Sequence, residues 1–524
     1  MSFSEKDNEK VLVDSYPPVR VVSASDNATQ RVARDIAADL VAELDAGFEV
    51  TPEMKRRVLR KIDFILLPLI SCTATLSFLD KVSNNYANNY GLQVRLGMHG
   101  TQFSWSASVF YFAFLIWQPA VSYMTQHFPL GKLVSINCIC WGLVLLGQGF
   151  VKNYAGFMVL RFFQVRILLV GVSLTGQGIF EACVLPSFLV MCSIYWTREE
   201  QSFRSAFWFN SCAGILGGLF AYAMGHFHPA PGYSLYQYIY IVYGSFTTGW
   251  GVMLFFALPD SPVTAWFFSH EERLTAVARV KGNNTGMINR HFDRSQMWEA
   301  LLDPKTWWFF LFTFVCNIPN GGLNAFSTTI IKGFGFTTLE TTLMSVPWGV
   351  VCTLGNGVIG LCISYTVGKR LFLMAFAIIP PMIGTVVMYT IPHSNKAPSL
   401  FAYYITGFYN APYVMSLALM ASNTAGTTKK SVTSAIIWMS YCGGNIAGPF
   451  FYRSKDAPTY QFGTAALLTC FSLQVVLALL FRVYLLHLNR QKELAFEPSE
   501  HDESAQHAFA DLTDKQNTDF RYTY

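Results

Sequence analysis

Long stretches almost free of charged residues recur along this chain, and they constrain its fold more than any other feature. Windows of about 20 apolar residues follow one another from Ile62 to Leu486. An α-helix needs about 20 such residues to cross the hydrocarbon core of a bilayer. The pattern therefore predicts an all-α protein that crosses a membrane many times.

The composition excludes several other classes of protein. Charged residues make up 13% of the 524 residues, against about 25% in soluble domains. So little charge excludes a soluble multidomain enzyme and a disordered scaffold, and a membrane β-barrel would need residues that alternate every second position. The net charge of +5 is scattered along the chain, so we expect no nucleic-acid partner.

Motifs for metal binding and catalysis are missing from the sequence. The 11 cysteines lie mostly in apolar stretches without CxxC spacing, which is typical of small core residues. His226 and His228 form a lone HxH at a predicted helix end, and there is no P-loop, GxSxG or HExxH. We therefore expect no metal, no cofactor and no enzymatic activity.

The apolar windows fall into two groups of six. We predict a tail over 1–57, a six-helix half over 58–259, a charged central loop over 260–305, a second half over 306–487 and a tail over 488–524. The predicted spans are 61–90, 102–124, 131–150, 154–195, 205–226, 236–258, 306–331, 341–366, 369–391, 399–424, 431–452 and 461–487. Gly131-Lys132 and Gly368-Lys369 recur at the same place in each half, as in transporters built from two parallel repeats.

Lysines and arginines near the span ends predict how the chain crosses the membrane. With the N-terminus inside, most of them lie on the inner side, among them Lys55–Lys61, Lys132 and Lys429–Lys430. Basic loops are enriched on the cytoplasmic side of membranes. The distribution therefore favours two cytoplasmic tails and an even number of spans.

One predicted span is too long. Tyr154–Trp196 contains 43 residues, and splitting it would invert every later loop against the charge rule. Removing Val165–Gln177 shortens the separation of Arg161 and Glu181 from 20 residues to 7, which places them on one helix face. We hypothesise that 165–177 is a translated intron or gene-model error, leaving 511 working residues. The alternative is a genuine insertion that bulges from the helix, and the spliced transcript distinguishes the two.

Four of the ionisable residues inside predicted spans carry the functional expectation, because charge in hydrocarbon is costly. An arginine stays charged when buried and binds a carboxylate with two parallel hydrogen bonds, so Arg161 is a candidate anion site and Glu181 a candidate proton carrier. Asp80 and Lys81 form an acid–base pair in the outer half of span 1. The alternatives are a structural Arg–Glu pair and a pair at the water interface.

Polar residues in spans 7 and 10 are further candidates. In span 7, the asparagines with Gly321 and Gly322 predict a broken or bent helix that exposes backbone to a substrate, and the alternative is a packing kink at Pro319. Glycines over 214–225 and 443–448 predict close helix packing. The substrate-binding candidates here are Asn317, Asn320, Asn324, Tyr409 and Asn410.

Several longer motifs carry a family resemblance: LRFFQ and GIFEACVLPSF, FLDKVSNNYANNYGL, IPNGGLNAFSTTIIKGFGF, ASNTAGTTKK and GPFFYRSKDAPTY. With them, residues 55–490 resemble the fungal allantoate permease group of the anion:cation symporter family, within the major facilitator superfamily. One departure is the loop YMTQHFPLGK, which has Gln126 and His127 where an acid and a base are usual, and this weakens the expectation of a gating charge network there.

The resemblance implies a twelve-helix major facilitator fold and proton-driven uptake of a small carboxylate, such as allantoate, another ureido acid, nicotinate or pantothenate. It implies that Asp80 and Glu181 carry protons while Lys81 and Arg161 bind the anion. We expect a monomer in the lipid bilayer of the plasma membrane that works by alternating access. The alternative function is a nutrient sensor of the same fold that binds its ligand without moving it.

Overall fold

The computed structural model describes residues 50–162, 183–197, 200, 204, 213–281, 293–365, 368–392, 395–494, 512–517 and 520–524. Within these ranges every regular element is a helix, which confirms the predicted all-α class. Each of the twelve predicted spans contains at least one described helix. The suspected insertion at 165–177 and Glu181 lie outside the described residues.

The first helix set covers the first six predicted spans. Its members are α2 (Pro52–Asn89), α3 (Leu92–Arg95), α4 (Gln102–His127), α5 (Leu130–Gln148), α6 (Tyr154–Phe162), α8 (Val184–Tyr195), α10 (Ala213–Met224) and α11 (Leu235–Ala257). Two helices of the central loop follow, α12 (His270–Lys281) and α13 (Arg294–Leu302).

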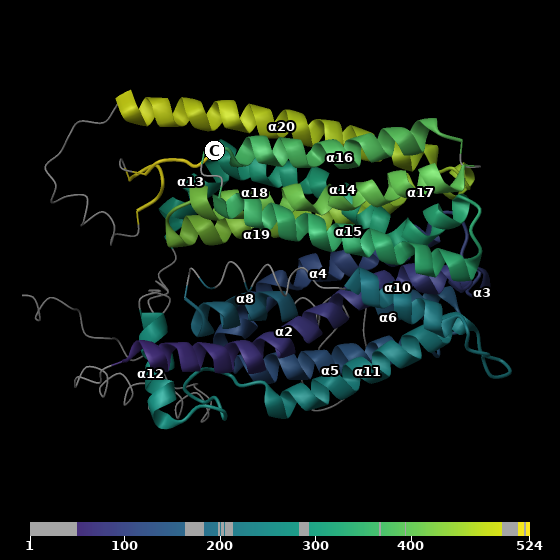
Figure 1. The fold of residues 1–524 in the computed structure, drawn as a ribbon, viewed down its shortest axis with the longest axis horizontal. Helices are drawn as coiled ribbons and strands as arrows, with labels where there is room; N and C mark the ends of the chain where they lie inside the picture. Colours follow the sequence, from purple (N-terminus) through teal and green to yellow (C-terminus); the bar gives the residue numbers. More distant parts are fainter. Residues whose placement is uncertain are drawn as a thin grey trace, which may run out of the picture. The chain divides into compact units, whose positions relative to one another are not determined.

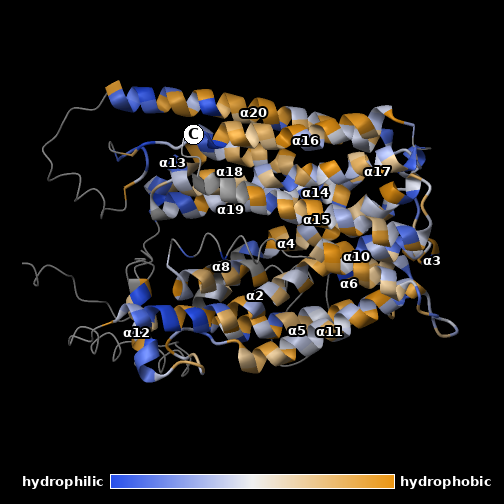
Figure 2. Cartoon of the chain, in the orientation of Figure 1, coloured by the Kyte–Doolittle hydropathy of each residue, from blue (hydrophilic) through white to orange (hydrophobic). Residues whose placement is uncertain are grey.

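The second helix set covers the last six predicted spans. Its members are α14 (Pro304–Gly333), α15 (Thr338–Tyr365), α16 (Arg370–Thr390), α17 (Lys396–Ile405), η1 (Thr406–Asn410), α18 (Ala411–Asn423), α19 (Thr427–Ala447), η2 (Gly448–Phe451), η3 (Ser454–Asp456) and α20 (Gln461–Leu494). Figure 1 shows the two helix sets running side by side, and Figure 2 shows apolar residues along most of their length.

Five of the described helices are long and apolar enough to cross a membrane by length and composition. They are α2, α5, α11, α16 and α20. Two of them extend beyond the predicted spans. Helix α2 starts at Pro52 with Thr51 as its N-cap, and α20 continues to Leu494. Hydrogen bonding within a helix does not end where the hydrocarbon ends, so charged residues prolong both helices past the apolar windows.

The predicted break in span 7 is wrong. Helix α14 is continuous from Pro304 to Gly333, with Pro319 inside it. Proline removes the donor that would normally reach the carbonyl four residues earlier. Here that carbonyl belongs to Val315, and Gln474 Nε2 of α20 lies 3.5 Å from it as a donor. A neighbouring helix therefore compensates for the proline, and no backbone is released for a substrate.

The break lies instead in span 10, where none was predicted. The 3₁₀ turn η1 separates α17 from α18, and Pro412 stands at the start of α18. Pro412 has no N–H to donate to the carbonyl of Phe408, four residues earlier. The regular helical ladder is therefore interrupted over η1, and α18 begins at Ala411.

Glycines let the helices of each set approach closely. A Cβ on Gly142 of α5 would lie 2.5 Å from Thr248 N of α11, and one on Gly251 would lie 2.7 Å from Ile139 N. In the second set a Cβ on Gly444 would lie 2.5 Å from Phe314 O. This confirms the predicted packing role of the glycines in 443–448, while the glycine seam between α5 and α11 was not predicted.

The two helix sets meet along α2 with α14, α4 with α19, and α10 with α15. A Cβ on Gly214 would lie 3.0 Å from Gly349 Cα, so backbone crosses backbone, as predicted for the glycines in 214–225. We call the end where α2 begins the tail end, and the other the far end. Polar bonds join the sets at the far end: Asn88 Nδ2 donates to Thr329 Oγ1 (3.2 Å), and Ser104 Oγ donates to Pro449 O (2.9 Å).

Candidate functional site

A pocket lies between the two helix sets, at a depth where the predicted intramembrane charges gather. It encloses about 450 Å³ of empty space, part of which is open to solvent. Only about 30 Å³ of this space is free to hold another atom, so the pocket is narrow in this structure. Its lining comes from α2, α4, α6, α14 and η2: Asp80, Lys81, Asn84, Ala107, Phe110, Tyr111, Arg161, Gly321, Asn324, Ala325 and Pro449.

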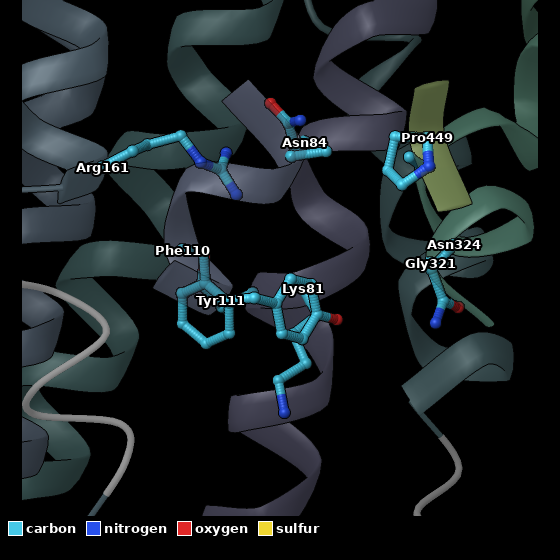
Figure 3. Close-up of a pocket in the computed structure, with 11 residues that line it drawn as sticks. Lys81, Asn84, Phe110, Tyr111, Arg161, Gly321, Asn324 and Pro449 are labelled. Carbon is cyan, nitrogen blue, oxygen red and sulfur yellow. The ribbon is translucent and has the colours of Figure 1, made fainter. Parts of the chain in front are cut away.

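Arg161 is the most unusual side chain of this pocket. It stands near the end of α6 and is only 4% exposed. Its Nε and Nη1 have no hydrogen-bond partner among the described residues, and its guanidinium lies 5.6 Å from the Phe157 ring centroid. Figure 3 shows the guanidinium extending from its helix toward the middle of the pocket. A buried cation with unused donors is suited to bind an anion, because each free N–H can give a charge-assisted hydrogen bond to a carboxylate oxygen.

Asp80 is held in part by a neighbouring helix. The side chain is 3% exposed, and its Oδ2 accepts a hydrogen bond of 2.8 Å from Trp141 Nε1 of α5. Ser83 Oγ lies 3.4 Å from Asp80 Oδ1 as a second donor. The indole therefore fixes the orientation of this carboxyl group at the pocket wall.

Lys81 follows Asp80 on α2 and is partly exposed to the pocket. Its Nζ lies 4.8 Å from the Phe78 ring centroid and 5.9 Å from that of Phe110. Aromatic faces stabilise an ammonium group without neutralising it. Lys81 therefore adds a second cation to the wall that carries Arg161.

Asn84 belongs to the site, although it was not among the predicted residues. Its Nδ2 lies 3.4 Å from Ser106 Oγ as a donor, and its Oδ1 accepts from Tyr240 OH at 3.3 Å. Asn84 stands one helical turn after Asp80, so the i, i+4 rule would have placed both on one face. Tyr240 also lies close enough to Arg161 to interact with it electrostatically.

The amides predicted in span 7 form a network that runs away from the pocket. Asn324 lines the pocket and donates to Asn320 Oδ1 (2.8 Å), and Asn320 donates to Asn445 Oδ1 (2.8 Å). Asn445 donates in turn to Asn317 Oδ1 (3.2 Å), and Tyr409 OH donates to Asn320 Oδ1 (2.8 Å). These mutual bonds leave Asn324 as the member placed to meet a ligand.

The structure thus brings together part of the predicted site. Asp80, Lys81, Arg161 and Asn324 line one pocket. Asn317, Asn320 and Tyr409 stand behind it in the amide network, and Asn410 ends the turn η1 outside the lining. The unpredicted contributors are Asn84, Phe110, Tyr111, Trp141 and Tyr240.

The Gly131-Lys132 hinge between α4 and α5 contacts the end of α11 at the tail end of the first helix set. A Cβ on Gly131 would lie 2.5 Å from Leu258 O, and Lys132 N donates to Asp260 Oδ1 (3.0 Å). The glycine therefore allows the α4–α5 turn to press against the end of α11. The carboxylate that this loop lacks in its own sequence is supplied by Asp260.

Comparison with known sequences gives a consistent picture. A family model described as the Major Facilitator Superfamily matches residues 70–449. An uncharacterized transporter of Schizosaccharomyces pombe is 34% identical and aligns over 93% of each chain. The allantoate permease of Saccharomyces cerevisiae is 32% identical, over 92% of this chain and 89% of its own, and a thiamine pathway transporter of the same yeast is 32% identical, over 93% and 90%.

Solved structures share the fold at much lower identity. A bacterial homolog of the human lysosomal transporter Spinster, in an inward-facing and occupied conformation, superposes with a TM-score of 0.57. It is 11% identical and covers 80% of this chain and 95% of its own. A nucleoside transporter, NupG, gives a TM-score of 0.53 at 12% identity, over 80% and 98%.

Proposed function

Because the chain belongs to the Major Facilitator Superfamily, and its relatives are membrane transporters, we propose that it imports a small organic anion together with protons. The substrate class is a carboxylate, such as allantoate, another ureido acid, nicotinate or pantothenate. The similarity to an allantoate permease supports this class.

The single observation that carries the proposal is Arg161. Its buried guanidinium keeps Nε and Nη1 unused by the described residues at the edge of the pocket between the helix sets. Leaving a buried charged donor unpaired is costly, roughly 1–3 kcal/mol or more. A substrate carboxylate at this position would remove that cost, and Lys81 would add a second attraction from α2.

The proton route is assigned to the two carboxyl groups. Asp80, oriented by Trp141, lines the same pocket as Arg161, so protonation there changes the charge that the anion meets. Glu181 is proposed as the second proton carrier. Protonation of one carboxyl group on the outer side would favour anion binding, and loss of that proton inside would favour anion release.

The same proposal includes the topology. Both tails lie in the cytoplasm and the chain works as a monomer in the plasma membrane, with six-helix halves over 58–259 and 306–487. The basic residues of the tail end support this orientation, because Lys55, Arg56 and Arg60 are exposed at the start of α2. The polar bonds that join the helix sets at the far end support an inward-facing state.

Uptake of radiolabelled carboxylates, in a host that lacks its own permeases, tests the proposal. Wild-type uptake should be accumulative and should collapse with a protonophore. Arg161→Ala should lose uptake, and Arg161→Lys should retain little uptake because one ammonium cannot replace the planar fork. Arg95→Ala is the control, since Arg95 is exposed and its variant should behave as wild type. Full uptake by Arg161→Ala would refute the site, and ligand binding without accumulation would favour the nutrient sensor.

A further inference from the structure

Residues 512–517 and 520–524 pack onto the tail end of the second helix set, far from the transport pocket. Asn489 Nδ2 of α20 donates to Tyr522 O (2.9 Å), and Tyr522 N donates back to Asn489 Oδ1 (2.9 Å). Thr523 N donates to Asn423 Oδ1 (2.7 Å), at the end of α18. These paired bonds hold the segment in one register against the helix ends.

An ionic cluster anchors the same segment. Asp514 is fully buried, forms an ion pair with Lys305, and lies 2.8 Å from Lys429 Nζ through its Oδ1. Glu299 and Asp303 also converge on this cluster, but Lys429 Nζ lies 2.7 Å from Asp303 Oδ2. Two lysine ammonium groups therefore already pair with these three carboxylates, and the cluster is a salt-bridge network rather than a cation site. Burial lowers the pKa of Lys429, but Asp303 and Asp514 outweigh this and raise it overall.

A second pocket opens beside this cluster, between α20 and the docked segment. It encloses about 640 Å³ of empty space, part of which is open to solvent. Lys305 in its lining is paired with Asp514, so Lys492 and Lys515 supply the excess of positive charge on the wall. Its polar and aromatic lining residues include Asp303, Lys305, Tyr484, Lys492, Lys515 and Tyr522.

Lys492 carries much of this excess. Its Nζ donates to two backbone carbonyls, Asp514 O (2.6 Å) and Asn517 O (2.7 Å), which orient the ammonium but do not neutralise it. Burial lowers its pKa to about 8, and the nearby Asp514 carboxylate only partly opposes this. The cations that face it and add to the lowering are Lys305, Arg521 and Lys429. Lys515 is exposed at the rim and has no ion pair with any described residue.

The pocket follows the exposed apolar stretch of α20, which is where a helix leaves the acyl chains for the headgroups. Leu480 and Val483 of α20 are 59% and 66% exposed, as expected of side chains that face acyl chains. Lys492 stands nine residues after Val483, about 13 Å further along the helix. Basic pockets at this depth on the cytoplasmic side are suited to phospholipid headgroups.

We propose that this second pocket binds the phosphorylated headgroup of an anionic phospholipid and that the bound headgroup holds residues 512–524 against the helix ends. The phosphate meets Lys492 and Lys515, while the acyl chains run along the exposed apolar face of α20. Since Lys515 and Tyr522 belong to the docked segment, the complete site exists only when the segment is in place. Headgroup binding must therefore stabilise the docked arrangement by mass action.

Binding of dioctanoyl phosphatidylinositol 4-phosphate to the purified full chain tests the proposal. Microscale thermophoresis in detergent should detect saturable binding, and dioctanoyl phosphatidylcholine should not bind. The double variant Lys492→Gln/Lys515→Gln should bind at least about tenfold more weakly, since each basic residue near a membrane surface contributes severalfold. Arg490→Gln is the matched control, because Arg490 is an exposed cation of the same helix outside the lining.

The contrary outcomes are equally defined. If the Arg490→Gln control and the double variant lose the same affinity for the lipid, the attraction is a general effect of charge, and the proposed headgroup site is wrong. If inorganic phosphate binds as tightly as the lipid, the ligand is free phosphate, and the proposal of a phospholipid is wrong. If the double variant does not fold, Lys515→Glu alone serves, because this side chain is exposed and its reversal should still weaken binding. Wild-type affinity in that variant would also refute the site.

Discussion

The glycine seam between α5 and α11 gives a prediction whose size follows from the structure. Gly244 of α11 faces the backbone of α5 so closely that an added Cβ would lie 2.5 Å from Leu146 Cα. Ordinary van der Waals contact begins at 3.4 Å, so Gly244→Ala requires the two helices to separate by about 1 Å. The obstacle is backbone, which cannot rotate aside as a flexible side chain would.

The expected cost of Gly244→Ala is about 1–3 kcal/mol, the usual range for overpacking a filled interior. The separation would also strain neighbouring contacts of the seam, such as the bond from Gln237 Nε2 to Gly149 O (2.8 Å). For a helix set of about 200 residues this corresponds to a fall in melting temperature on the order of 5 °C. Fluorescence-detected size-exclusion chromatography after heating in detergent measures it.

Gly249→Ala is the control, since it introduces the same methyl group five residues away on α11. A Cβ at Gly249 has nothing within 4 Å, and alanine favours a helix over glycine by roughly 0.5–1 kcal/mol. The control should therefore be neutral or slightly stabilised. If the Gly244 and Gly249 variants melt at the same temperature, the close approach of α5 and α11 is not what limits the first helix set, and the reasoning fails.

Three further predictions concern the two pockets and the amide network. Trp141→Phe removes the indole donor of Asp80, so initial uptake rates should fall at least about tenfold while surface expression is kept. Unchanged uptake would exclude a positioning role for Trp141. Asn320→Leu removes the acceptor that Tyr409 uses and should lower stability by about 1–3 kcal/mol, read as a lower melting temperature. Headgroup binding should weaken severalfold from pH 7 to pH 9, because Lys492 has its pKa lowered to about 8 and loses its charge in that interval. Lys492→Arg should abolish this pH dependence, since arginine stays charged. Wild-type binding that does not change with pH would contradict the prediction.

Local rules were sufficient to find the charged part of the transport pocket. Asp80, Lys81 and Arg161 stand out in the sequence because an ionisable residue in hydrocarbon is costly wherever it occurs. Trp141 and Tyr240 could not be found in this way, since an aromatic residue in an apolar span carries no such signal. Their roles depend on which helix packs beside α2, and that is fixed by contacts between distant parts of the chain.

The error at span 7 has the same origin. Pro319 with two nearby glycines satisfies every local criterion for a broken helix, yet α14 is continuous because Gln474 lies beside the carbonyl that the proline leaves. Gly321 instead admits the backbone of α19, where a Cβ would lie 2.6 Å from Asn445 O. The sequence shows that a residue is small or lacks a hydrogen-bond donor. The neighbouring helix determines whether that residue breaks its own helix or allows close packing.

The polar bonds at the far end bear on how easily the two helix sets can part. Asn85 of α2 accepts hydrogen bonds from Thr328 N (3.2 Å) and Thr328 Oγ1 (2.7 Å), and Ser108 Oγ of α4 donates to Ile446 O (2.9 Å). Each such bond contributes only about 0.5–1.5 kcal/mol net, because water offers the same partners once the surfaces separate. Water therefore hydrates these groups as the closure opens, and each bond adds little to the energy needed to part the helix sets. An interlocked apolar closure of the same area would have no such replacement partner and would hold the transporter in a single state.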